Sequence, residues 1–241
     1  MQETIFITGT SRGLGRGLAR ACLDSGASVL GCSRGDSELS ETDPEAYRHL
    51  QLDLQDPGTG KPLLEKAISG METLDRVILN AGMLPPIRDM RDTPLEVLRE
   101  TMEVNLWSNK WILDSVLAMP AKPSQVIAIS SGAAVSGSRG WNGYSLSKAA
   151  LNMLIKLYAA EESEVHFIAL APGLVETAMQ DAISGTEDDE AFETVQRLKA
   201  ARGTPDMPSP DEVASRILAL MDDLKDRPSG AFIDIRDLET P

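Results

Sequence analysis

The chain has 241 residues, 42% of them hydrophobic, a proportion that allows a buried core without disulfide bonds. Its formal net charge of −14 argues against binding to nucleic acid or an anionic membrane, because both require a basic surface. No run approaches the ~20 apolar residues of a membrane span, and two isolated cysteines without a metal-ligand cluster indicate a cytoplasmic protein with reduced thiols and no metal site.

Short apolar runs alternate with segments of helical periodicity along the whole sequence. The expected strands are Thr4–Thr8, Ser28–Gly31, Leu50–Asp53, Arg76–Asn80, Gln125–Ser130, Val165–Ala171 and Ala231–Ile235. They are rich in Val, Ile and Leu and mostly do not alternate with polar residues, which indicates strands covered on both faces. The pattern predicts an α/β chain of one domain, residues 1–241, with a Rossmann-type doubly wound parallel sheet of about seven strands and helices on both faces.

The first expected strand leads directly into a glycine-rich turn and then a helix. The turn reads Thr-Gly-Thr-Ser-Arg-Gly-Leu-Gly, and its candidate ligand-binding residues are Gly9, Ser11, Arg12, Gly13, Leu14 and Gly15. Glycines let a backbone approach a pyrophosphate closely, and the start of the following helix offers free N–H groups and a partial positive charge. The turn therefore predicts a phosphate-binding site.

Two segments interrupt the strand–helix rhythm. Residues 83–94 are rich in proline and are expected to form a loop at the carboxyl end of a strand. Residues 178–210 contain the acidic run Glu187–Glu190 and three prolines. The acidic run has the composition of a solvated surface, and the longer segment is a candidate lid over a ligand.

Tyr144 and Lys148 are a candidate proton-transfer pair. They are four residues apart in a segment of helical periodicity, so on a helix they share one face. A free tyrosine, with a pKa of ~10, exchanges protons poorly at neutral pH. A nearby ammonium group favours the phenolate, and we therefore expect Lys148 to lower the pKa of Tyr144.

The glycine spacing Thr-Gly-x-x-x-Gly-x-Gly resembles that of the short-chain dehydrogenase/reductase family. Further residues that match this family's motifs follow in the same order along the chain: Asp53, Asn80, Ala81, Gly82, Asn105, Ser131, Tyr144, Lys148, Pro172, Gly173, Val175 and Thr177. Ser131 lies thirteen positions before Tyr144, as in the family, and the adjacent Ser130 is an alternative.

The resemblance implies reversible hydride transfer between a nicotinamide cofactor and a small carbonyl substrate. By the same resemblance, Asn105, Ser131, Tyr144 and Lys148 would be catalytic, with Asn105 helping to hold a water that links Lys148 to solvent. Asp53 would contact the adenine. Further cofactor contacts are implied for Asn80, Ala81, Gly82, Tyr144, Lys148, Pro172, Gly173, Val175 and Thr177.

The end of the second expected strand indicates which nicotinamide cofactor is used. An acidic residue there would bind the adenosine ribose and repel a 2′-phosphate. This chain instead has Ser33 and Arg34, with no acid before Asp36. Arg34 can pair with a phosphate and Ser33 can donate a hydrogen bond to it, while Arg12 supplies a second cation. The expected cofactor is NADP(H).

A short motif and a set of apolar residues give weaker indications of the substrate. The sequence from Thr177 to Gln180 reads Thr-Ala-Met-Gln and resembles the sepiapterin reductase and benzil reductase branch, whose members reduce vicinal dicarbonyls. Five residues could line an apolar pocket for a bulky ketone: Met83, Leu84, Trp107, Trp141 and Met179.

A second apolar stripe on the helix that carries Tyr144 bears on the assembly of the protein. Leu146, Ala150, Met153, Leu154 and Leu157 form a second apolar stripe on the Tyr144 helix, and the resemblance implies a homodimer or homotetramer. Two alternatives remain: an NADP-dependent alcohol dehydrogenase working in the reverse direction, and a non-catalytic NADP(H)-sensing protein. His49 and His166 are interpreted as packing residues without a function.

Overall fold

One sheet of seven parallel strands organises the computed structural model, which describes residues 2–186 and 191–238. The strands are β1 (Thr4–Thr8), β2 (Ser28–Ser33), β3 (Tyr47–Gln51), β4 (Arg76–Leu79), β5 (Gln125–Ile129), β6 (His166–Ala171) and β7 (Ala231–Asp234). Their order is β3-β2-β1-β4-β5-β6-β7, so the direction of winding reverses between β1 and β4. The predicted doubly wound parallel sheet is confirmed, and the reversal marks where such sheets bind ligands.

The predicted position of the third strand was wrong by a few residues. It was expected at Leu50–Asp53, but β3 covers Tyr47–Gln51, and Asp53 follows it. This strand lies at the edge of the sheet and pairs only with β2. An edge strand has a solvated side, so it tolerates exposed residues such as Arg48 and shows no continuous apolar run.

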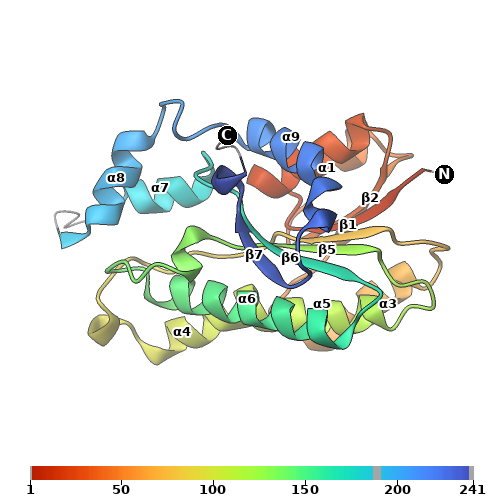
Figure 1. Ribbon diagram of the computed structural model, residues 1–241, viewed down its shortest axis with the longest axis horizontal. Coiled ribbons are helices and arrows are strands. Elements are labelled where there is room, and N and C mark those ends of the chain that lie inside the picture. The colour runs from red at the N-terminus through yellow and green to blue at the C-terminus, as the bar shows by residue number, and fades with distance from the viewer. Residues whose placement is uncertain (1, 187–190, 239–241) are drawn as a thin grey trace.

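Helices cover both faces of the sheet (Figure 1). They are α1 (Gly13–Asp24), α2 (Leu39–Thr42), α3 (Pro57–Ile68), α4 (Leu95–Met102), α5 (Ser108–Leu117), α6 (Asn142–Glu161), α7 (Ala178–Ser184), α8 (Glu193–Ala201) and α9 (Pro210–Leu220). Ile5 and Ile7 of β1 pack with α1 and α9, whereas Phe6 packs with α3, α5 and α6 on the opposite face. Within the described residues, every helix is too short or too polar to cross a membrane.

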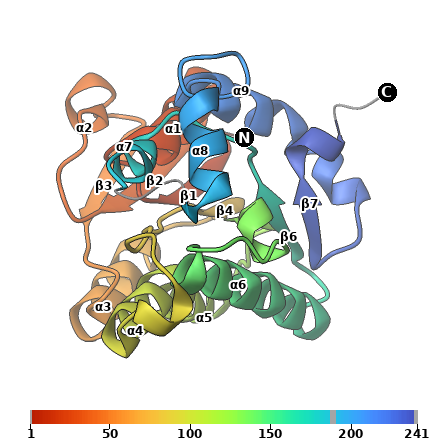
Figure 2. The same cartoon turned by 90° about the vertical axis from the view of Figure 1, so that its left-hand side faces the viewer.

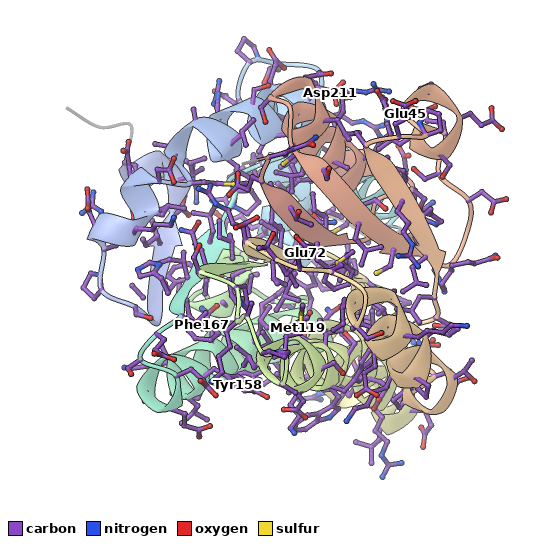
Figure 3. The ribbon with its side chains drawn as sticks, turned by 90° about the vertical axis from the view of Figure 1, so that its right-hand side faces the viewer. Glu45, Glu72, Met119, Tyr158, Phe167 and Asp211 are labelled. Carbon is purple, nitrogen blue, oxygen red and sulfur yellow. The ribbon has the colours of Figure 1, made fainter. Side chains whose placement is uncertain are left out.

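The long helix α6 is anchored at its far end. The ring of Tyr158 stacks on that of Phe167 in β6 with their centres 6.2 Å apart, as Figure 3 shows from the amino-terminal side of the sheet. The Tyr158 hydroxyl also donates a hydrogen bond to Asp114 Oδ1 of α5 at 2.6 Å. Because α6 is held against both elements, residues in its first turns have fixed positions relative to the sheet.

Helices α7 and α8 lie at the end of the molecule where the strands terminate (Figure 2). They belong to the segment 178–210. The acidic run Glu187–Glu190 of that segment lies outside the described residues. The helices close one side of the region reached by the carboxyl ends of β4, β5 and β6.

Candidate active site

The glycine turn between β1 and α1 forms an open anion-binding surface. Gly9 and Gly13 have φ angles of +80° and +58°, which favour glycine. A Cβ on Gly15 would lie 2.1 Å from the carbonyl oxygen of Gly9, so only glycine permits this close approach. Among the described residues, no side chain caps the start of α1, and its first turn contains no acidic residue. The N–H groups of this turn therefore remain available to a phosphate.

The remaining residues of the glycine turn have different environments. Leu14 is buried and packs in the core between α1 and the sheet, while Ser11 is half-buried and Arg12 is exposed. A cavity of about 430 Å³ is lined by Arg12, Gly13 and Thr177, among others. The structure therefore brings the glycine turn and the segment after β6 together around one space.

The segment after β6 carries the predicted residues from Pro172 to Thr177. Gly173 has a φ of +74°, which turns the chain away from the strand. Val175 is buried in the core beneath the segment, whereas Pro172 and Thr177 are half-buried. A Cβ on Gly13 would lie 3.5 Å from the Thr177 methyl group. Thr177 thus lies directly beside the glycine turn.

Asn80 and Ala81 join the ends of β4 and β1. The Thr8 hydroxyl accepts hydrogen bonds from the backbone N–H groups of Asn80 and Ala81 at 3.0 and 2.9 Å. The Asn80 side-chain amide donates to the Thr8 carbonyl oxygen at 2.9 Å. Since its amide group binds protein backbone, Asn80 contributes to the site by fixing the position of the glycine turn.

Asn105 lies in a π-helical turn, Glu103–Trp107, between α4 and α5. Its Nδ2 donates to the Met83 carbonyl oxygen at 2.9 Å, and its Oδ1 accepts from the Met83 N–H at 2.8 Å. Nδ2 also donates to the Ser147 hydroxyl at 3.0 Å. Both amide hydrogens of Asn105 therefore bind protein, which positions the loop after β4 against α6.

Ser147 is a site residue that the sequence analysis missed. Its buried hydroxyl accepts from Asn105 and donates to the Tyr144 carbonyl oxygen at 2.8 Å. It occurs between Tyr144 and Lys148, three residues after the tyrosine, so its position on the same helical face was a usable signal.

Tyr144 and Lys148 are both buried on the inner face of α6, at 8% and 4% exposure. Lys148 Nζ donates to the Ile129 carbonyl oxygen at the end of β5 at 2.7 Å, and it lies 5.8 Å from the centre of the Tyr144 ring. A Cβ on Gly82 would lie 3.6 Å from Nζ and 3.3 Å from Asn105 Oδ1. The structure thus brings together Gly82, Asn105, Tyr144 and Lys148.

The two candidate serines after β5 are clearly distinguished. The Ser130 hydroxyl is buried and donates to Asn152 Oδ1 at 2.5 Å. The side chain of Ser131 instead hydrogen-bonds Tyr144, and its oxygen accepts from the Ala133 N–H at 3.1 Å. Ser131 therefore lies with Tyr144, while the Ser130 hydroxyl is bound to Asn152; which serine acts in catalysis stays a prediction.

Burial controls the ionisation of this cluster. Burial raises the pKa of Tyr144, and the hydrogen bond with Ser131 lowers it in part. Burial lowers the pKa of Lys148 to about 8. The expected lowering of the Tyr144 pKa by Lys148 and by the positive ring of an oxidised nicotinamide concerns the cofactor-bound site and stays a prediction; in the protein alone, desolvation of the phenolate has the larger effect.

Apolar side chains from α7 and α8 cover the tyrosine. The ring of Tyr144 packs edge-on against Trp141 with their centres 5.9 Å apart, and both join a buried cluster with Ile183, Phe192 and Val195. Leu84 and Met179 pack against this cluster, and their role as pocket residues stays a prediction. Two expected pocket residues differ, because Trp107 is 48% exposed and Met83 contributes backbone contacts to Asn105.

The ribose end of the site contains Ser33, Arg34 and Asp53. The Ser33 hydroxyl donates to the Gly35 carbonyl oxygen at 2.7 Å, so its hydrogen is committed within the loop. Donation from Ser33 to a phosphate would require this hydroxyl to turn away from Gly35, and it stays a prediction. Arg34 and Arg12 are exposed and have no carboxylate partner among the described residues. Asp53 is exposed and accepts from the Gln55 N–H at 3.0 Å.

Neither histidine belongs to a metal site. In the part of the chain that the structure describes, no group of three or more His, Cys, Asp or Glu side chains could hold a metal ion. Cys22 and Cys32 are both buried as free thiols, and burial raises the pKa of each to about 12.

Comparisons with known proteins agree with this arrangement. The sequence profile described as short chain dehydrogenase matches residues 3–188. A benzil reductase ((S)-benzoin forming) from Bacillus subtilis is 29% identical over 98% of this chain and 99% of its own. A sepiapterin reductase from Bos taurus is 34% identical, with 96% and 93% covered. The crystal structure of a short chain dehydrogenase/reductase from Saccharomyces cerevisiae superposes with a TM-score of 0.88 at 25% identity, covering 98% and 96%.

The buried amine of Lys148 should make the protein's stability depend on pH. Its pKa falls from 10.5 to about 8 on folding, so the unfolded chain binds more protons between these pH values and stability rises with pH across this window. Such a shift corresponds to about 3 kcal/mol, and an unpaired Ile129 carbonyl in Lys148→Met offsets about 1 kcal/mol. We expect Lys148→Met to be about 2 kcal/mol more stable than the parent at pH 7.

Urea denaturation of the nucleotide-free protein at about pH 7 and about pH 9.5 measures this effect. The advantage of Lys148→Met should shrink at the higher pH, where the parent no longer carries the full cost of the buried cation. Lys156→Met, on the exposed side of the same helix, is the control and should show no such pH-dependent gain. A pH-independent difference between Lys148→Met and the parent would contradict the explanation.

Proposed function

The chain belongs to the short-chain dehydrogenase family of oxidoreductases, and from that premise we propose that it is an NADPH-dependent reductase of ketones or dicarbonyls. The observation that carries the proposal is the group formed by the buried Tyr144 and Lys148 with the half-buried Ser131 at the carboxyl end of β5, beside Gly82. A hydroxyl pair and an amine meet at the carboxyl ends of the strands, near the point where the winding of the sheet reverses, which is where such sheets bind dinucleotides.

The residues around the glycine turn fit a dinucleotide. The uncapped first turn of α1 would bind the pyrophosphate, and Thr177 lines the same cavity. Arg12 and Arg34 would pair with a 2′-phosphate, which supports NADP(H) over NAD(H). When bound, the reduced nicotinamide supplies hydride to the carbonyl carbon.

Tyr144 would donate the proton that the reduction requires at the carbonyl oxygen. Its raised pKa keeps the phenol protonated at neutral pH, which suits the reductive direction. Ser131, in contact with the same hydroxyl, would orient the carbonyl oxygen by a hydrogen bond. Lys148, held by Ile129, would stabilise the phenolate that remains after proton transfer.

Asn105 and Ser147 would hold this group in place. Asn105 connects the loop after β4 to Ser147, and Ser147 binds the backbone of Tyr144. This direct link from loop to helix supports a positioning role for Asn105. Its expected part in holding a water remains a proposal.

The substrate is proposed to be apolar near its carbonyl group. Trp141, Leu84 and Met179 surround or adjoin the Tyr144 ring, and α7 and α8 pack over it as a lid within residues 178–210. The relatives named benzil reductase and sepiapterin reductase support vicinal dicarbonyls as the first substrates to test. Loss of NADPH absorbance at ~340 nm with 1,2-diketones, pteridine side-chain ketones, quinones and 3-ketoacyl thioesters tests the proposal, and nucleotide binding without oxidation across such a panel would favour a sensor.

Tyr144→Phe should reduce kcat by at least ~100-fold, because it removes the proton donor. NADPH binding, measured by fluorescence titration, should stay within a factor of about two, since the ring and its packing persist. Tyr158→Phe is the matched control: Tyr158 lies on the same helix as Tyr144, its hydroxyl binds Asp114 of α5, and its removal should leave kcat unchanged. A fully active Tyr144→Phe variant would refute the assignment.

Arg34→Ala should raise KM for NADPH by about tenfold or more, because a charge-assisted pair with the 2′-phosphate is worth roughly 1.5–3 kcal/mol. KM for NADH should change little. Steady-state kinetics with both cofactors measure the difference, and Arg227→Ala, an exposed arginine before β7, is the control. Equal increases for NADPH and NADH would remove the argument for NADP selectivity.

A homodimer or homotetramer is proposed from the outer face of α6. Leu146, Met153 and Leu157 are 50%, 54% and 53% exposed along one stripe of this helix. Met153→Glu should shift the mass measured by light scattering at micromolar concentration towards that of one chain, because it would bury a charge in the interface. Met90→Glu, exposed elsewhere, should leave the mass unchanged. A monomeric parent would contradict the proposal.

A further inference from the structure

A chain of side-chain hydrogen bonds connects the glycine turn to the loop between β2 and α2. The Thr10 hydroxyl lies 2.7 Å from the Tyr47 hydroxyl, and the latter lies 2.9 Å from His49 Nδ1. His49 Nε2 lies 3.0 Å from the Gly35 carbonyl oxygen. Thr10 and Tyr47 are buried, so the connection runs through the interior at the edge of the sheet.

The chemistry of the last group determines the direction of every bond in this chain. The Gly35 carbonyl oxygen can only accept, so His49 Nε2 carries the hydrogen between them when the Ser33 hydroxyl, 3.2 Å from the same nitrogen, donates to Gly35. In the neutral ring, Nδ1 then accepts from the Tyr47 hydroxyl, whose oxygen accepts from Thr10. The Ser33 hydroxyl donates to the same Gly35 oxygen at 2.7 Å. Both acceptor positions of this carbonyl are therefore used.

The sheet provides the space for this chain at Gly31. A Cβ on Gly31 would lie 2.2 Å from the Tyr47 hydroxyl oxygen and 2.5 Å from the Thr10 hydroxyl oxygen. Gly31 pairs with His49 in the register of β2 and β3. A glycine in the middle of a strand weakens it, and here its absent side chain admits the Tyr47–Thr10 pair.

The two loops joined in this way carry the two exposed arginines. Arg12 follows Thr10 by two residues, and Arg34 lies between Ser33 and Gly35. The Arg34 carbonyl oxygen also accepts from Gln51 Nε2 at 2.9 Å. The backbone on either side of Arg34 is thus held by β3, while its guanidinium remains exposed without a carboxylate partner among the described residues.

We propose that Tyr47 and His49 are positioning residues that hold the Arg12 and Arg34 loops at the separation required by a 2′-phosphate, and so set the preference for NADP(H) over NAD(H). The inference rests on the cofactor preference proposed above and adds the residues that support it. A ligand without the 2′-phosphate does not need this separation, so loss of the chain affects one ligand class selectively.

The test compares adenosine 2′,5′-bisphosphate with adenosine 5′-monophosphate by isothermal titration calorimetry. The two ligands differ only by the 2′-phosphate, and neither contains nicotinamide, so the readout is independent of turnover. Tyr47→Phe and His49→Leu should each weaken the bisphosphate about five- to tenfold, the loss typical of one or two hydrogen bonds. The monophosphate should change less than about twofold, and His49→Gln, whose amide can still donate to Gly35, should recover part of the loss.

His166→Leu is the matched control. Its Nε2 binds the Arg227 carbonyl oxygen at 2.9 Å at the opposite end of the sheet, so it removes a similar bond without touching either loop. Denaturation curves establish which variants are folded. If Tyr47→Phe does not fold, the nucleotide affinities of His49→Gln provide the test. In turnover, KM for NADPH should rise in Tyr47→Phe and His49→Leu while kcat stays unchanged.

Three outcomes distinguish the proposals. A parent protein that binds both nucleotides equally overturns the NADP preference and this inference together. A parent that prefers the bisphosphate, with variants that retain that preference, overturns only the positioning role. Equal weakening of both nucleotides in Tyr47→Phe and His49→Leu would show a general structural role and would also overturn it.

Discussion

The arrangement of the site depends on the hydroxyl of Thr8, which connects the ends of β1 and β4. It accepts from two consecutive N–H groups after β4 and thereby ties the end of that strand to the end of β1. These are the two strands between which the winding of the sheet reverses. The glycine turn follows β1 on one side of this connection. Gly82, with Asn105 and Lys148 beside it, follows β4 on the other side. The glycine turn and the group around Tyr144 therefore keep a fixed relation without being adjacent in sequence.

The burial of the Lys148 amine beside these residues carries an electrostatic cost. Lys148 is buried against a carbonyl oxygen, and burial lowers its pKa to about 8. The chain as a whole carries a net charge of −14, which disfavours an anionic ligand at long range. Exposed cations such as Arg12 and Arg34 can overcome this only over distances comparable to the screening length, roughly 8–10 Å. Their placement by the surrounding loops consequently matters more than their number.

Much of the fold followed from local patterns in the sequence. The strands β1, β4, β5, β6 and β7 were predicted within a residue or so of their ends, because a strand covered on both faces needs a continuous apolar run. The order of the short motifs indicated the family and the residues that the structure gathers around Tyr144. The edge strand β3 was misplaced because only one of its sides is buried, and its polar residues resemble those of a loop.

Sequence alone established the sheet, the glycine turn and the helical pairing of Tyr144 with Lys148, because each depends on neighbours a few residues apart. Tertiary structure decided which hydroxyl accompanies Tyr144, since Ser130 and Ser131 point to different partners. It also gave His49 a set of hydrogen bonds that no local pattern indicates. Its contact with Gly35 and the onward contact of Tyr47 with Thr10 join residues far apart in sequence, so they exist only once the strands have paired.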